Sequence, residues 1–206
     1  MTITTSLSGM EIRTISFLIE NISDQFAIRD IARRSGIDYK LVHSAVQKLA
    51  DKEVIIKQKI AHADLCSLDL RGDLSPVYYV ESVRAMAFLS RHPVIRNVFE
   101  AVKQRIPSVY YSLIIFGSFS KGSQTKASDL DLLIISSNRA AGEEIARIIH
   151  SESIHLGMKI HSIVVDEKEF VDNLKDKKQN VVIEAFKSHI IIAGVEGFYE
   201  GVRKTI

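Results

Sequence analysis

The sequence contains one cysteine, Cys66, and no tryptophan among its 206 residues. A single cysteine excludes an internal disulfide and a cysteine-rich metal site, and it leaves a buried, inert thiol as the expectation. No segment reaches the roughly 18 consecutive apolar residues that a membrane span requires. Residues 1–9 lack the basic start of a secretory signal. We therefore expect a cytoplasmic protein without a membrane partner. The net charge of +2 is too small to indicate a nucleic-acid partner by itself.

The overall composition is that of a folded protein, with 46% hydrophobic and 25% charged residues. The length allows one large domain or two small ones. Charge is distributed unevenly, because residues 28–59 hold eight Lys and Arg but only four Asp and Glu. This local surplus indicates a separate basic module near the N-terminus. We expect two domains, at residues 1–75 and 76–206.

Helical and extended patterns follow one another in the N-terminal part. Apolar residues recur at helical spacing in three segments, residues 12–19, 28–32 and 41–49. Gly36 is expected to end the second helix, because glycine suits a left-handed C-terminal position, and Asp38 to cap the third. Residues 54–56 and 65–70 are expected to be strands. The predicted order is helix, helix, tight glycine turn, helix and β-hairpin.

This order resembles the winged helix-turn-helix of many archaeal and bacterial regulators, over residues 8–72. The resemblance implies double-stranded DNA as a partner, with the third helix in a groove and flanking basic residues at phosphates. The residues expected at DNA are Arg33, Arg34, Tyr39, Lys40, His43, Ser44, Gln47, Lys48, Lys57 and Lys59. Such domains commonly act as dimers, so a homodimer is possible. A protein-contact module or a solvated basic face are the alternatives.

The remainder of the chain alternates between helical and extended patterns. Residues 72–80 contain Gly, Ser and Pro and are expected to form a connector. The expected strands are residues 111–116, 130–135 and 159–165, with 190–192 as either strand or helix end. The expected helices are residues 83–89, 94–106, 143–150, 167–174 and 181–189. The chain as a whole is therefore predicted to be α+β, with a mixed sheet flanked by helices in its C-terminal part.

The segment "IIFGSFSKGSQTKASDLDLLII", residues 114–135, carries the strongest functional signal. An apolar strand ends at Gly117-Ser118, and a second apolar strand begins at Asp129-Leu130-Asp131. Strand alternation places Asp129 and Asp131 on one face, where two like charges favour a shared hard cation. Gly117 permits close backbone approach, and Ser118 offers a hydroxyl and an N–H. These features suit a metal-bound polyphosphate, although two exposed aspartates in a plain connection are the alternative.

Gly-Ser, ten residues, then Asp-x-Asp resembles the signature of the DNA polymerase beta-like nucleotidyltransferase superfamily, and in particular its minimal members. The resemblance covers about residues 92–170, and Ser128 fits the usual Ser-Asp-x-Asp form. It implies a nucleoside triphosphate as substrate and Mg²⁺ (or Mn²⁺) as cofactor. Asp129 and Asp131 would be the catalytic metal ligands. The nucleotide-binding residues would be Gly117, Ser118, Lys121 and Ser128, although Lys121 is equally compatible with a solvated loop lysine.

The family also expects a third carboxylate on a neighbouring strand, and this chain departs from that pattern. The candidate strand, residues 158–165, contains no Asp or Glu. Asp166 stands at its end but is expected to cap a helix, because Glu169 follows three residues later. His161 occupies the place of the missing acid, either as a structural residue or as a metal ligand or proton acceptor. The departure puts catalysis in question more than nucleotide binding.

Three functions remain open at the level of sequence. The first is a nucleotidyltransferase with a DNA-binding winged helix, which transfers a nucleotidyl group to an unknown acceptor. The second is a transcription regulator whose degenerate transferase domain senses nucleotide or mediates dimerisation. The third is an antitoxin that modifies a toxin partner or another protein acceptor.

Overall fold

The computed structural model describes residues 6–60, 63–106, 110–176 and 178–206. The chain divides into two compact units, Met1–Glu81 and Ser82–Ile206. The boundary between them lies inside helix α4 (Ser75–Arg91). Across the described ranges, no helix is both long and apolar enough to cross a membrane.

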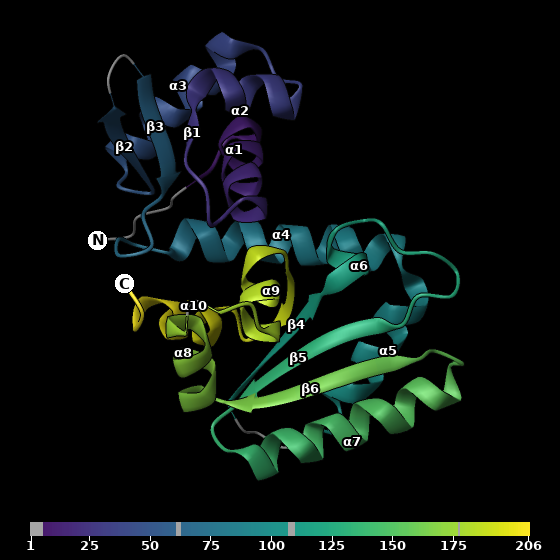
Figure 1. Cartoon of the computed structure of the whole chain (residues 1–206). Helices are drawn as coiled ribbons and strands as arrows, with labels where there is room; N and C mark the ends of the chain where they lie inside the picture. Colours follow the sequence, from purple (N-terminus) through teal and green to yellow (C-terminus); the bar gives the residue numbers. More distant parts are fainter. Residues whose placement is uncertain (1–5, 61–62, 107–109, 177) are drawn as a thin grey trace. The chain divides into compact units, whose positions relative to one another are not determined.

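The first unit packs helices against a small antiparallel sheet (Figure 1). Its elements before α4 are, in chain order, α1 (Gly9–Glu20), β1 (Phe26–Ala27), α2 (Ile28–Ser35), α3 (Tyr39–Asp51), β2 (Ile55–Ile60) and β3 (Ala63–Leu68). Strand β3 lies between β1 and β2 and pairs antiparallel with both. Apolar side chains from the helices form the core, among them Ile15, Leu18, Val42 and Leu49.

Local chemistry sets the helix boundaries in this unit as the sequence predicted. Gly36 ends α2 in a left-handed conformation with φ of 65°. The Asp38 carboxylate accepts a hydrogen bond from the Lys40 backbone N–H at 2.9 Å, so it caps α3. Cys66 is fully buried, and desolvation raises the pKa of its thiol to about 11. The prediction of a buried thiol is confirmed.

The second unit contains a mixed four-stranded sheet of order β6-β5-β4-β7 among its described residues. Its elements after α4 are α5 (Pro93–Lys103), β4 (Tyr111–Phe116), α6 (Gly117–Ser120), β5 (Leu130–Ser136), α7 (Arg139–His155), β6 (Ile160–Asp166), α8 (Glu167–Lys175), α9 (Val181–Lys187), β7 (Ile190–Ala193) and α10 (Val195–Arg203). Strand β4 pairs antiparallel with β5 and β7, whereas β5 and β6 are parallel. Helix α7 supplies the crossover that parallel pairing requires (Figure 1).

Both faces of the two central strands are buried, which explains why β4 and β5 are nearly continuous apolar runs. Alternate residues such as Leu113 and Leu132 join a core cluster with side chains of α5 and α7. On β5, Leu133 is fully buried as well, although it points to the opposite face. Helices α8 and α10 lie together near the C-terminal end of β5 (Figure 1). The architecture is a mixed α+β fold.

The structure corrects the expected connector at residues 72–80. Helix α4 begins at Ser75 and runs without interruption to Arg91. Ser75 and Pro76 fit a turn as well as the first turn of a helix, so their pattern favoured a connector. Proline is well tolerated in the first turn of a helix, where its missing N–H would have no intrahelical partner. Strand β5 also begins at Leu130, so Asp129 precedes the strand instead of lying within it.

Candidate functional site

Gly117 and Asp131 meet where β4 ends. The antiparallel register of β4 and β5 pairs Phe116 with Asp131, which brings the next residue, Gly117, beside the aspartate. Gly117 has φ of 70°, and a Cβ built there would collide with Asp131 Oδ2. Only glycine therefore combines this backbone conformation with such a close carboxylate. The small residue and the acid that the sequence predicted to lie together are in contact.

The two aspartates flank a fully buried leucine. Leu130 is 1% exposed, and its backbone N–H donates to the Lys159 carbonyl at 3.0 Å, which fixes the start of β5 against β6. Asp129 is exposed, whereas the Asp131 side chain is 32% exposed. Because Leu130 points into the core, Asp131, the next residue of the strand, projects from the opposite face of the sheet.

His161 is the cross-strand neighbour of Asp131. The parallel register of β5 and β6 pairs the two residues, and His161 Nδ1 lies 3.4 Å from Asp131 Oδ1. The imidazole is 66% exposed. Asp166 is occupied elsewhere: its carboxylate accepts from the Glu169 N–H at 2.8 Å, and the Glu169 carboxylate accepts from the Asp166 N–H at 3.0 Å. This capping box confirms the predicted N-cap.

The remaining predicted nucleotide-binding residues lie in the segment that joins β4 to β5. The Ser118 carbonyl accepts a hydrogen bond from the Ser123 N–H at 3.0 Å. The Ser128 hydroxyl accepts from the Thr125 N–H at 2.9 Å, so it closes a turn just before Asp129. Lys121 Nζ lies 3.0 Å from Glu184 Oε1 of α9. No local sequence pattern indicated Glu184, because it is 63 residues away from Lys121 along the chain.

A cavity of about 720 Å³ opens beside Asp129. This volume is within the range of small-molecule sites, roughly 300–1,000 Å³. Its lining includes Phe119, Ser128, Asp129 and Lys159 together with Gln124. The Gln124 Oε1 atom is buried without a hydrogen-bond partner among the described residues. An unpaired buried acceptor is costly. Sequence patterns carried no signal for Gln124.

The donor set fits a divalent cation in part. Carboxylate and imidazole nitrogen are common metal ligands, and Asp131 and His161 present one of each side by side. Over the ranges that the structure describes, no group of three or more His, Cys, Asp or Glu is arranged to hold a metal ion. A cation bound by Asp131 and His161 would therefore need oxygen atoms from a substrate to complete its coordination shell.

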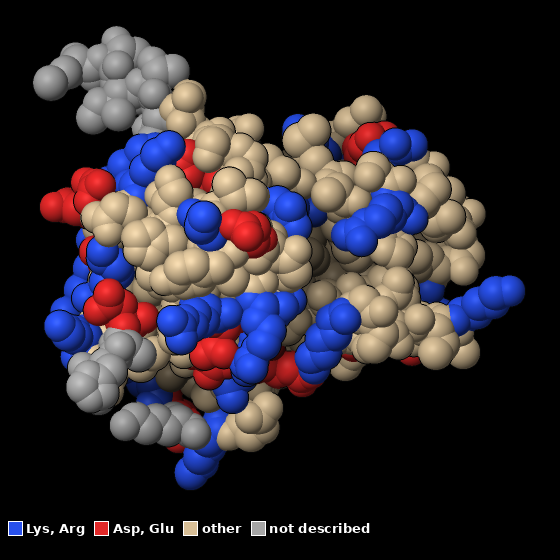
Figure 2. All heavy atoms as spheres, turned by 90° about the horizontal axis from the view of Figure 1, so that it is seen from above, with Lys and Arg blue, Asp and Glu red and all other residues tan. Residues whose placement is uncertain are grey.

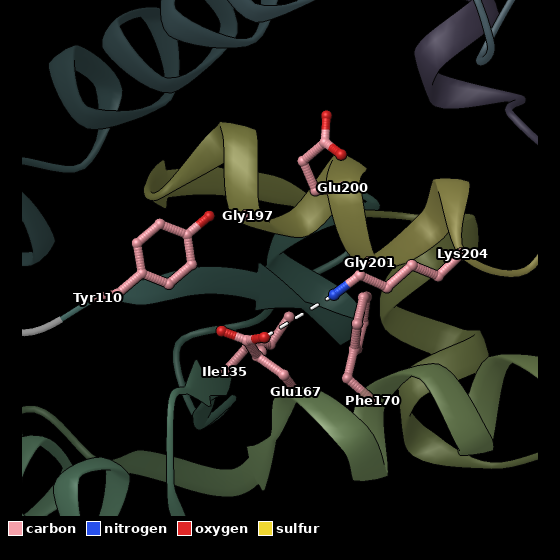
Figure 3. A pocket seen from close by; sticks show the side chains of 8 residues that line it. All are labelled: Tyr110, Ile135, Glu167, Phe170, Gly197, Glu200, Gly201 and Lys204. Carbon is pink, nitrogen blue, oxygen red and sulfur yellow. Dashed lines mark ion pairs between the residues drawn. The ribbon is translucent and has the colours of Figure 1, made fainter.

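A second, smaller pocket of about 280 Å³ lies at the other end of β5 (Figure 3). Ile135 of its lining is four residues from Asp131, about 13 Å along an extended strand. The Lys204 ammonium of the lining lies 3.9 Å from Glu167 Oε2. Burial, and then nearby carboxylates including Glu167, raise the pKa of the Tyr110 phenol. None of the predicted site residues lines this pocket.

All residues expected at DNA are exposed in the first unit. Gln47 of α3 donates to Asp51 at 2.9 Å and accepts from Lys57 of β2 at 2.8 Å, so a helix and a strand of this set are linked. Arg34 stacks over the Phe26 ring at 4.9 Å. On the face of the molecule shown in Figure 2, Lys and Arg side chains form several adjacent groups with acidic side chains between them.

Comparison with known proteins agrees with this geometry. Residues 95–192 match the family model described as Nucleotidyltransferase domain. The match spans Gly117, Ser118, Asp129, Asp131 and His161, so this part of the second unit is similar to a nucleotidyltransferase domain. Such domains suggest nucleotidyl transfer in general, and they use nucleoside triphosphates with divalent metal. No curated protein matches the chain.

Proposed function

We propose that the second unit binds a nucleoside triphosphate together with Mg²⁺ or Mn²⁺ and transfers its nucleotidyl group to an acceptor hydroxyl. The close contact of Gly117 with the Asp131 carboxylate is the observation that carries this proposal. Asp129, two residues before Asp131, borders the cavity. When bound, the cation neutralises phosphate charge and favours departure of pyrophosphate. The chain's own residues hold and orient the reactants.

Each site residue has a role that follows from its position. Asp131 and Asp129 supply oxygen ligands from the end of the sheet. Gly117 allows the Asp131 carboxylate to lie against the backbone at the end of β4, and the Ser118 hydroxyl and N–H donate to phosphate oxygens. Lys121 contributes a positive charge once a phosphate competes with Glu184 for its ammonium. The cavity then accommodates the remainder of the nucleotide.

Isothermal titration with non-hydrolysable analogues of ATP, GTP, CTP and UTP in the presence of Mg²⁺ tests this proposal. The wild type should bind at least one of them, and Asp131→Asn should reduce that affinity at least tenfold. Asp172→Asn is the matched control, because Asp172 is an exposed acid on α8 of the same unit. Equal binding by Asp131→Asn and Asp172→Asn, or no binding by the wild type, would refute the proposal.

We further propose that the first unit is a winged helix that binds double-stranded DNA. The exposed basic and polar side chains on α3, and the hydrogen bond from Lys57 to Gln47, support this interpretation, because they link the third helix to the first strand of the hairpin. A gel-shift screen of genomic fragments should detect binding that weakens steeply as salt rises. Lys48→Gln should weaken binding to all fragments, whereas Glu20→Gln should not. Absence of binding at low salt would exclude this role.

The alternative for the whole protein is a transcription regulator whose transferase domain senses nucleotide or mediates a homodimer. The capping box that occupies Asp166 favours this alternative, because it removes the nearest candidate for a third carboxylate. Transfer of a radiolabelled nucleotidyl group to protein or nucleic-acid acceptors separates the two functions. Nucleotide binding without any transfer would support the sensor.

A further inference from the structure

We propose that His161 is a direct cation ligand that takes the place of the third carboxylate, and that the site therefore favours cations that accept nitrogen ligands, such as Mn²⁺, Co²⁺ or Zn²⁺, over Mg²⁺. This inference rests on the proposed function, because it concerns the cation that accompanies the nucleotide. The parallel register puts His161 directly beside Asp131, the position from which a neighbouring strand reaches the same ion.

The separation of the two donor atoms suits a shared ion better than a hydrogen bond. His161 Nδ1 and Asp131 Oδ1 are 3.4 Å apart. A good N–H···O hydrogen bond is shorter, about 2.7–3.2 Å between heavy atoms. Two ligand atoms that each lie about 2.1 Å from one ion are about 3.0 Å apart at a right angle and about 3.4 Å apart at the tetrahedral angle. The observed distance therefore leaves room for an ion between the two side chains.

The imidazole is also available for ligation. It is 66% exposed, and its weak contact with Asp131 is its sole hydrogen bond among the residues that the structure describes. A structural histidine is usually buried or held by stronger hydrogen bonds. His189 of the same unit shows the contrast, because it is 2% exposed and lies within hydrogen-bond distance of two backbone carbonyls. His161 lies instead at the open side of the Asp131 carboxylate.

Replacing a carboxylate by an imidazole changes which cations bind best. Mg²⁺ prefers oxygen ligands in near-ideal octahedral geometry, whereas imidazole suits transition metals. With two protein donors in contact, the rest of the coordination shell would come from triphosphate oxygens, from Asp129 and from water. His161 would thus supply a ligand from β6, whose one acid, Asp166 at the strand end, is occupied as the cap of α8.

Pulsed electron paramagnetic resonance of Mn²⁺ with a non-hydrolysable nucleotide analogue tests both ideas separately. A coupling to ³¹P reports a phosphate bound to the ion, and a coupling to ¹⁴N reports a bound imidazole. The wild type should show both couplings. His161→Gln should lose the ¹⁴N coupling and keep the ³¹P coupling, and the matched control His150→Gln, an exposed histidine of α7, should keep both. A ¹⁴N coupling from the nucleotide base would persist in His161→Gln, so it can be distinguished from the coupling to the His161 imidazole, which this variant loses.

His161→Asp supplies the complementary measurement, because it restores a carboxylate at this position. Isothermal titration should show that the ratio of Co²⁺ to Mg²⁺ affinity falls at least tenfold in His161→Asp relative to the wild type. A ³¹P coupling with no histidine-dependent ¹⁴N coupling, or an unchanged affinity ratio, would overturn this inference and leave the proposed function intact. Absence of the ³¹P coupling in the wild type would instead refute nucleotide binding at the site.

Discussion

The contact between Gly117 and Asp131 can be broken by one methyl group. In Gly117→Ala, the added Cβ would collide with the Asp131 carboxylate, and alanine would be held at φ of 70°. Left-handed backbone costs a non-glycine residue about 1–2 kcal/mol. Forcing the Asp131 side chain out of its rotamer costs about 0.5–1.5 kcal/mol more. We therefore expect a loss of roughly 2–3 kcal/mol in stability and a displaced carboxylate.

Gly122→Ala separates these two effects. Gly122 lies in the same loop with φ of 67°, but a Cβ there would meet nothing within 4 Å. This variant should therefore lose only the backbone contribution, about 1–2 kcal/mol of the free energy of unfolding. Each kcal/mol lowers the Tm by roughly 2–4 °C. Both variants should remain folded at 20 °C, so their nucleotide binding can be compared directly.

Isothermal titration with Mg²⁺ and a nucleotide analogue, accompanied by thermal unfolding, decides the outcome. Gly117→Ala should lose at least tenfold in nucleotide affinity, because the Asp131 carboxylate is no longer in place. Gly122→Ala should bind within about twofold of the wild type. If the two variants bind nucleotide equally well, the contact between Gly117 and Asp131 is not part of a nucleotide site, and the proposed function loses its main support.

Three further predictions concern other contacts. Burial by itself would raise the pKa of Glu11, but hydrogen bonds from Lys52 and Ser8 outweigh it and lower the pKa from 4.5 to about 2. The carboxylate therefore contributes up to about 3 kcal/mol to the free energy of unfolding above pH 5, and this contribution is lost as the pH falls towards 2. Urea unfolding of Glu11→Gln should accordingly show a weaker loss of stability between pH 5 and pH 3 than the wild type, and parallel curves would contradict this. Glu184→Gln should raise nucleotide affinity about two- to fivefold in titration, because it frees Lys121 from a largely exposed ion pair; unchanged affinity would exclude a phosphate role for that lysine. Asp166→Ala should cost about 1 kcal/mol in thermal unfolding by removing the α8 cap and leave nucleotide affinity unchanged, whereas a loss of affinity would show that the acid does more than cap.

Some features of this protein were predictable from the sequence, because they depend on residues that are close together along the chain. Strand β4 was predicted with its observed bounds, Tyr111–Phe116, because a continuous apolar run ending in glycine is typical of a central strand. Gly36, Asp38 and Asp166 were assigned to helix ends from residues within three positions of each. The proximity of the Gly117-Ser118 bend to Asp131 was also predictable, because the resemblance to the nucleotidyltransferase signature relates the two segments. Local patterns alone do not relate them.

Other features required the tertiary structure. The start of α4 at Ser75 was missed, because serine and proline fit both a turn and a first helical turn. The link from Lys121 to Glu184 joins residues that no local pattern connects. The cavity beside Asp129 and the unpaired Gln124 acceptor arise where separate elements converge.

Local sequence patterns were enough to identify the small and polar residues of the site, namely a glycine, a serine and two aspartates around the start of a buried strand. The sequence also pointed to His161 as the residue in the place of the missing acid. Its pairing with Asp131 is visible only in the folded chain, because it depends on the register between the parallel strands that α7 joins. Register is fixed by which apolar side chains fill the shared core, and core packing joins residues that are distant along the chain.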